Sequence, residues 1–93
     1  MNDDTRKCIE QAAAVLKAAG ASEVYVFGSA AAGALREDSD IDLAVSGLPP
    51  EEFFRAMGLA REAIGRELDL IDLDEQNLFT EYLKKKGKLR RVA

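Results

Sequence analysis

Apolar residues recur at intervals of three and four in three segments, the spacing of one face of an α-helix. The first segment, 4–19, follows acidic residues typical of a helix start and stops at Gly20. The second begins near Pro50, a residue that helices accept in their first turn, and carries its apolar stripe to Ile64. The third covers 75–86. The pattern predicts three amphipathic helices. In the last helix, four apolar residues are expected to face inward: Leu78, Phe79, Tyr82 and Leu83.

Shorter segments rich in β-branched, aromatic or alternating apolar residues are typical of strands. They cover 24–27, 40–46 and 68–73, and a short helix is expected over the alanine-rich stretch 30–35. Helices and strands in alternation predict a small α/β layer structure, with about three strands and four to five helices in one domain, 1–93. With so few strands, one face of the sheet is expected to be left to a partner.

Two acidic residues interrupt the apolar pattern of the second strand. Asp40 and Asp42 are two positions apart, so their side chains share a face, about 6.6 Å apart along the strand. Two unpaired carboxylates would repel each other there, and burying either one in its charged form is unfavourable. A pair of Mg²⁺ ions would remove the repulsion, because Mg²⁺ prefers carboxylate and phosphate oxygens. We interpret both residues as metal ligands.

A third carboxylate is expected from the third strand. Asp69 lies between two leucines and faces away from the core if those leucines pack inward, which places it beside Asp40 and Asp42. Asp72 has the opposite parity and is the alternative third ligand. Asp74 is expected in a loop or at a helix cap.

A Gly-Ser turn follows the first strand. Gly28 permits close approach of the backbone to a ligand, and Ser29 opens a short helix whose free N–H groups attract phosphate. Neither residue is informative alone, because turns use both constantly. Their conjunction with Asp-x-Asp in one strand and an acid in another predicts a site for metal and phosphate.

Composition narrows the chemistry further. The chain has no histidine and one cysteine, so catalysis would depend on carboxylates, hydroxyls, Lys or Arg, and no disulfide can form within the chain. The net charge of −4 argues against direct nucleic-acid binding by the whole surface. A basic tail, 84–93, is interpreted as a solvated helix end, with phosphate or partner contact as the alternative. We expect no signal peptide and no membrane span. We expect a cytoplasmic location.

The run GSAAAGALREDSDID resembles the Gly-Ser-x10-Asp-x-Asp signature of the polymerase-β-like nucleotidyltransferase superfamily. Residues 21–89 look like its minimal nucleotidyltransferase (MNT) branch. The resemblance implies a two-layer fold, with helices packed against a mixed sheet. It also implies transfer of a nucleoside monophosphate from ATP or another NTP, most plausibly AMP, with release of pyrophosphate.

The resemblance also implies a role for each site residue. Gly28 and Ser29 would hold the triphosphate, and the catalytic and metal-binding acids would be Asp40, Asp42 and Asp69, with two Mg²⁺ ions. One position departs from the pattern: Ala32 stands where members of the branch often have an arginine. Arg36 and the basic tail are the cations available to replace it.

The partner is implied by the resemblance as well. Members of the MNT branch are commonly paired with a small helical HEPN protein, for which the MNT is the antitoxin, and some of them add AMP to that protein. The expected acceptor is therefore a hydroxyl of a HEPN-type partner, in a homo- or hetero-oligomer. Two alternatives stay open: a catalytically weak nucleotide-binding antitoxin that acts by occlusion, and a small-molecule transferase of the aminoglycoside type.

Overall fold

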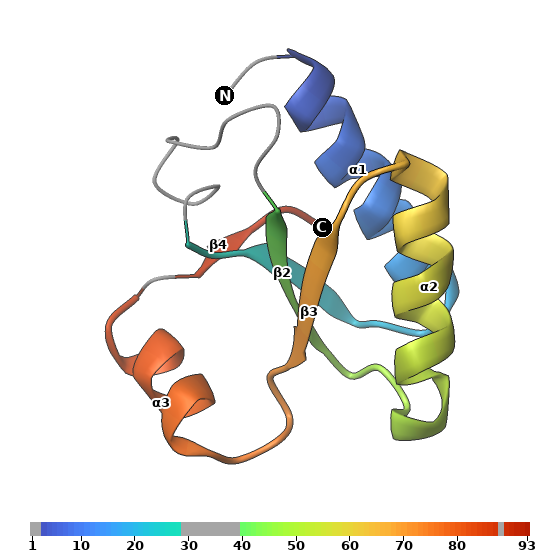
Figure 1. Ribbon diagram of the computed structural model, residues 1–93. Helices are drawn as coiled ribbons and strands as arrows, with labels where there is room; N and C mark the ends of the chain where they lie inside the picture. The colour runs from blue at the N-terminus through green and yellow to red at the C-terminus, as the bar shows by residue number, and fades with distance from the viewer. Residues whose placement is uncertain (1–2, 29–39, 88) are drawn as a thin grey trace.

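A four-stranded sheet forms the centre of the molecule in the computed structural model, which describes residues 3–28, 40–87 and 89–93 (Figure 1). In spatial order the strands are β3, β2, β1 and β4. Strand β2 pairs antiparallel with β1 and parallel with β3, and β4 pairs antiparallel with β1. The sheet is therefore mixed, as the resemblance implied. The strands are β1 Glu23–Val26, β2 Ile41–Ser46, β3 Leu68–Asp72 and β4 Arg90–Arg91.

Three α-helices occur in the described part of the chain, close to where the apolar periodicity predicts them. The second begins as a short 3₁₀ turn at Pro50, and the helix expected over 30–35 lies outside the described residues. No helix among the described residues is both long and apolar enough to cross a bilayer. The helical elements are α1 Asp3–Ala18, η1 Pro50–Glu52, α2 Phe53–Ile64 and α3 Leu78–Lys85.

The main core lies between one face of the sheet and the helices α1 and α2. Alternate residues of β1, β2 and β3 point into it, which explains why β2 reads Ile-Asp-Leu-Ala-Val. Helices α1 and α2 pack over that face, and Leu43 and Leu68 have no exposed surface. The strand side chains of this core are Val24, Val26, Ile41, Leu43, Val45, Leu68 and Leu70.

On the opposite face of the sheet, α3 is the helix of the described residues that packs against it. Helix α3 places Leu83 against Phe27 and Ala44 in a smaller apolar cluster, which also contains Leu73. In Figure 1 this helix lies to one side of the sheet, away from α1 and α2. In Figure 1 the N-terminal ends of β2 and β3 lie away from α3, so among the described helices none packs over them on this face.

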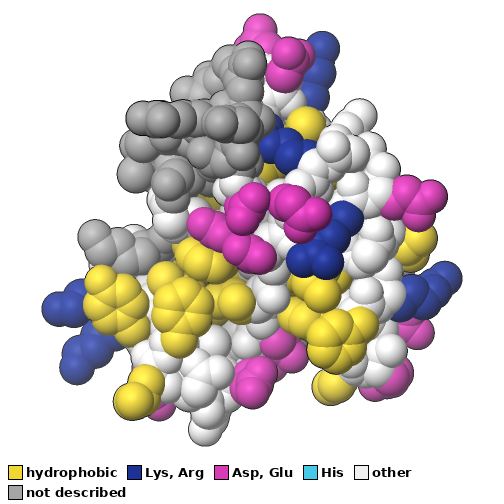
Figure 2. Space-filling model, viewed as in Figure 1, with side chains coloured by type: hydrophobic (Ala, Val, Ile, Leu, Met, Phe, Trp, Pro, Cys, Tyr) yellow, Lys and Arg dark blue, Asp and Glu magenta, His cyan; other side chains and the backbone are white. Residues whose placement is uncertain are grey.

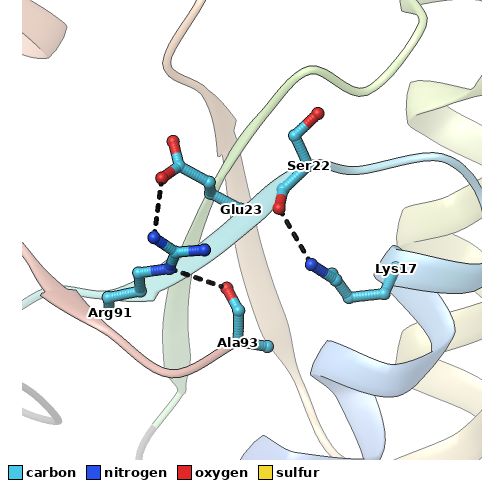
Figure 3. Close-up of polar contacts among 5 residues, drawn as sticks. All are labelled: Lys17, Ser22, Glu23, Arg91 and Ala93. Atoms are coloured by element: carbon cyan, nitrogen blue, oxygen red, sulfur yellow. Dashed lines mark hydrogen bonds and ion pairs between the residues drawn. The ribbon is translucent and has the colours of Figure 1, made fainter.

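Strand β4 adds one strand to the about three that were expected, and it forms from two exposed residues of the basic tail. Arg91 lies opposite Tyr25, and the Arg91 guanidinium forms an ion pair of 3.0 Å with Glu23 (Figure 3). Beyond the strand, the Val24 N–H donates to the Ala93 carbonyl at 3.0 Å. A two-residue basic strand has no alternation of apolar and polar residues, so hydrophobic periodicity cannot predict its pairing with β1.

Candidate active site

The pairing of β2 with β3 brings two of the predicted acids together. Asp42 lies directly opposite Asp69 in the parallel register. Residues opposite each other on neighbouring strands point to the same face, and here that face is the one remote from α1 and α2. Figure 2 shows acidic side chains gathered near the centre of this face, with hydrophobic side chains beside them over α3.

The carboxyl group of Asp42 is in an unfavourable place for a negative charge. Its pKa is raised above the ordinary value of 3.8, first by burial and then by the neighbouring charges of Asp69 and Asp40. Asp42 and Asp69 are also within hydrogen-bonding contact. The pair therefore favours the arrival of a positive charge, whether a proton or a metal cation.

Gly28 lies against the same acid. Its φ of +64° is in the left-handed region, and a Cβ added there would lie only 2.5 Å from Asp42 Oδ2. The turn is held in place because the Phe27 N–H donates to the Asp42 carbonyl at 3.1 Å. Glycine is thus required by the carboxylate of the site itself.

Asp40 precedes β2 and is exposed, close enough to raise the pKa of Asp42. Asp72 and Asp74 are engaged elsewhere: Asp72 Oδ1 accepts the Asp74 N–H at 2.9 Å. The carboxylate of Asp74 in turn accepts the Gly47 N–H at 2.7 Å, at the far end of β2. Asp69, and not Asp72, is therefore the β3 acid that shares a face with Asp42.

The remaining predicted site residues, Ser29 and Arg36, lie outside the described residues, as does Ala32. Within the described ranges, no group of three or more Asp, Glu or Cys side chains is arranged so as to hold a metal ion. The donors that do meet are carboxylate oxygens, which suit a hard cation such as Mg²⁺. The facing pair Asp42 and Asp69 fits such an ion by its chemistry.

An apolar patch beside the acids departs from the sequence-based expectation. Of the four residues of α3 predicted to face inward, only Leu83 is buried. Phe79 is 48% exposed and contacts Phe27 edge-to-face, with ring centroids 5.9 Å apart. Leu78 and Tyr82 are 87% and 51% exposed. We call Leu78, Phe79 and Tyr82 the α3 patch.

The comparisons with solved structures agree with this fold. A structure described as a candidate minimal nucleotidyltransferase aligns with a TM-score of 0.72 and 25% identity, over 96% of this chain and 91% of that one. A toxin–antitoxin structure with AMP-PNP aligns with a TM-score of 0.69 and 19% identity, over 97% of this chain and 72% of that one. A structure of the toxin–antitoxin pair MntA–HepT aligns with a TM-score of 0.65 and 18% identity, over 92% of this chain and 69% of that one.

Comparison with curated protein sequences found no match. The family model described as polymerase beta, nucleotidyltransferase does match, over residues 10–89. These residues include Gly28, Asp40, Asp42 and Asp69, and they span most of the domain. The chain therefore belongs to the polymerase-beta nucleotidyltransferase family.

Proposed function

We propose that this chain is a Mg²⁺-dependent nucleotidyltransferase that moves a nucleoside monophosphate, AMP from ATP, to a hydroxyl of a partner protein. The observation that carries the proposal is the facing pair Asp42 and Asp69, whose shared environment raises the pKa of Asp42. Two facing carboxylates are unfavourable without a cation, so the pair is suited to bind one. Family membership supports the class of reaction.

In the proposed reaction, the acceptor oxygen attacks the α-phosphorus of ATP. The new oxygen–phosphorus bond forms as the bond to the β-phosphate oxygen breaks, and pyrophosphate leaves with that electron pair. Asp69 accepts the proton of the acceptor hydroxyl. Gly28 and Ser29 hold the triphosphate, with Arg36 as a further contact. Two Mg²⁺ ions held by Asp40, Asp42 and Asp69 would neutralise and align the phosphates.

The α3 patch supports a protein acceptor. Its exposed apolar side chains lie on the acid-bearing side of the sheet, through the contact between Phe79 and Phe27. Small monomeric proteins rarely leave a large contiguous apolar patch in water, and such patches commonly mark interaction sites. A partner seated there would present a hydroxyl near Asp42 and Asp69. The likeness to toxin–antitoxin structures favours a HEPN-type toxin as that partner, with this chain as the antitoxin.

Labelled transfer tests this proposal. The chain is incubated with Mg²⁺, ATP labelled at the α-phosphate and a HEPN-type protein that forms a complex with it. We expect label on the partner with the wild-type chain, and a loss of at least about 100-fold in Asp42→Asn and Asp69→Asn. Glu62→Gln, an exposed acid on α2, is the matched control and should transfer normally.

Two results would overturn transfer to a protein. Neutralisation of the toxin without label, unchanged in Asp42→Asn, would establish inhibition by occlusion, which the α3 patch also favours. Label on an aminoglycoside with the chain alone would establish a small-molecule transferase. A Leu78→Ser, Tyr82→Ser double variant separates docking from chemistry, since we expect it to weaken the partner complex while leaving nucleotide binding intact.

A further inference from the structure

A small hollow lies between α1 and β4, on the opposite side of the sheet from the acids. Its volume is about 210 Å³. The floor is apolar and buried, formed by Ile9 of α1 and Val26 of β1. Arg90 stands at the rim, opposite Val26 in the antiparallel register, so it shares the face of Val26 and not that of Tyr25. The hollow is therefore separate from the proposed catalytic site.

The charges around the hollow are unbalanced. Arg6, Ile9 and Glu10 all line it from one face of α1, since positions three and four apart on a helix are neighbours. Within the described part of the chain, neither Arg6 nor Arg90 has an acidic partner. Arg91 also reaches the rim, but its guanidinium is already paired with Glu23 (Figure 3). Counting the described residues alone, two guanidinium groups without an acidic partner therefore outweigh the single carboxylate of Glu10 at this hollow.

We propose that this hollow binds a small organic anion, a carboxylate or phosphate monoester carried on a compact apolar group. Guanidinium groups donate two parallel hydrogen bonds to such oxyanions, and Arg6 and Arg90 flank an apolar floor that would receive the rest of the ligand. The size limits the candidates, because pockets for drug-sized ligands occupy about 300–1,000 Å³. A whole nucleotide is thus disfavoured.

The test uses benzoate and phenyl phosphate as probes, titrated into isotope-labelled full chain while amide chemical shifts are recorded. We expect saturable shifts at Ile9, Val26 and Arg90, with a dissociation constant on the order of 1 mM. Binding of both probes assigns a general oxyanion site. Binding of phenyl phosphate alone assigns a phosphomonoester site, and binding of benzoate alone assigns a carboxylate site.

Substitutions that remove a positive or a negative charge from the hollow should have opposite effects on binding. Arg6→Gln and Arg90→Gln should each weaken binding by about tenfold, because each removes a charge-assisted contact. Glu10→Gln should strengthen it by about threefold, because it removes the carboxylate that opposes the anion. Lys7→Gln is the matched control: it changes the net charge equally from the next position of α1 but does not line the hollow.

The proposal fails if neither probe shifts these amides, or if Lys7→Gln weakens binding as much as Arg90→Gln does. It also fails if phenyl phosphate shifts only the amides of Gly28 and Asp42, since that result would place the anion at the catalytic acids. The amide spectrum of each variant reports whether it is folded, and because the altered side chains are exposed we expect all four to keep the native pattern.

Discussion

Gly28 is the residue at which backbone conformation and site chemistry constrain each other most tightly. Gly28→Ala would place a methyl group 2.5 Å from Asp42 Oδ2 and hold alanine at a φ of +64°. We expect a loss of about 1–3 kcal/mol in the free energy of unfolding, from backbone strain and displacement of the carboxylate. Urea denaturation measures the loss, and transfer activity should fall with it.

Gly58 provides the control for this substitution. It lies inside α2, and a Cβ there would meet nothing within 4 Å. Gly58→Ala should therefore stabilise the protein by about 0.5–1 kcal/mol, since alanine is the better helix former. Equal effects of the two substitutions would contradict the role given to Gly28.

The raised pKa of Asp42 predicts a dependence of stability on pH. A carboxyl group whose pKa is higher in the folded state than its ordinary 3.8 stabilises the fold while protonated, below the ordinary value. That contribution is lost as the pH rises through the folded pKa. In the presence of EDTA, Asp42→Asn should therefore melt at a higher temperature than wild type at neutral pH, with the gap closing toward about pH 3.5.

Thermal melts at stepped pH measure this gap. Glu62→Gln, an exposed acid on α2, should melt like the wild type throughout. An Asp42→Asn variant that is less stable than wild type at neutral pH would show that its carboxylate stabilises the metal-free fold. Added Mg²⁺ should raise the melting temperature of the wild type and not of Asp42→Asn, if the acids hold the ion as proposed.

At the scale of elements, helix α3 depends on its N-terminal cap. The Asn77 side chain accepts the Thr80 N–H at 2.9 Å, and the Thr80 hydroxyl accepts the Asn77 N–H at 3.2 Å. Asn77→Ala should lower the free energy of unfolding by about 1 kcal/mol, within the range for lost caps. Hydrogen exchange should accelerate most in α3. Gln76→Ala, at the exposed preceding position, is the control and should leave exchange unchanged.

Local sequence patterns predicted the positions of the helices and strands whose apolar faces pack into the core. Alternation in β2 and β3 placed Ile41, Leu43 and Leu68 inward, and the same parity put Asp42 and Asp69 on the other face. The same kind of pattern predicted helix α3, but the inward packing expected of its four apolar residues is wrong for the three that are exposed. Periodicity identifies the side chains that share a face, and it does not say whether their partner is in the same chain.

At the candidate site, the sequence pattern predicted which acids share a face of the sheet, and their chemical roles stay predictions. Side-chain alternation along a strand favoured Asp69 only on the condition that Leu68 and Leu70 pack inward, and it left Asp72 as the alternative; the structure places both leucines in the core. The nearness of Gly28 to Asp42 depends on how β1 pairs with β2, a contact between residues distant in sequence. Strand β4 escaped prediction for the same reason, since its two basic residues have no pattern except the pairing with β1.

At the scale of the whole molecule, the position of the acids depends on the core behind them. Helices α1 and α2 pack on one face of the sheet, and that packing fixes the strands whose other face carries Asp42 and Asp69. A domain of this size buries a modest share of its surface, so its stability is expected to be about 5–14 kcal/mol. A single core defect should therefore affect the site from a distance.

Leu43 tests this coupling, because it is fully buried in the central strand β2, next to Asp42. Leu43→Ala should lower the free energy of unfolding by about 2–5 kcal/mol through lost burial and the cavity left behind, which would shift the urea midpoint down by about 1–3 M. Leu59→Ala, at a position of α2 that is 42% exposed, should cost less than about 1 kcal/mol. An unchanged urea midpoint in Leu43→Ala would contradict this coupling. Strand pairing alone would then fix the positions of the acids, and transfer activity would survive the substitution.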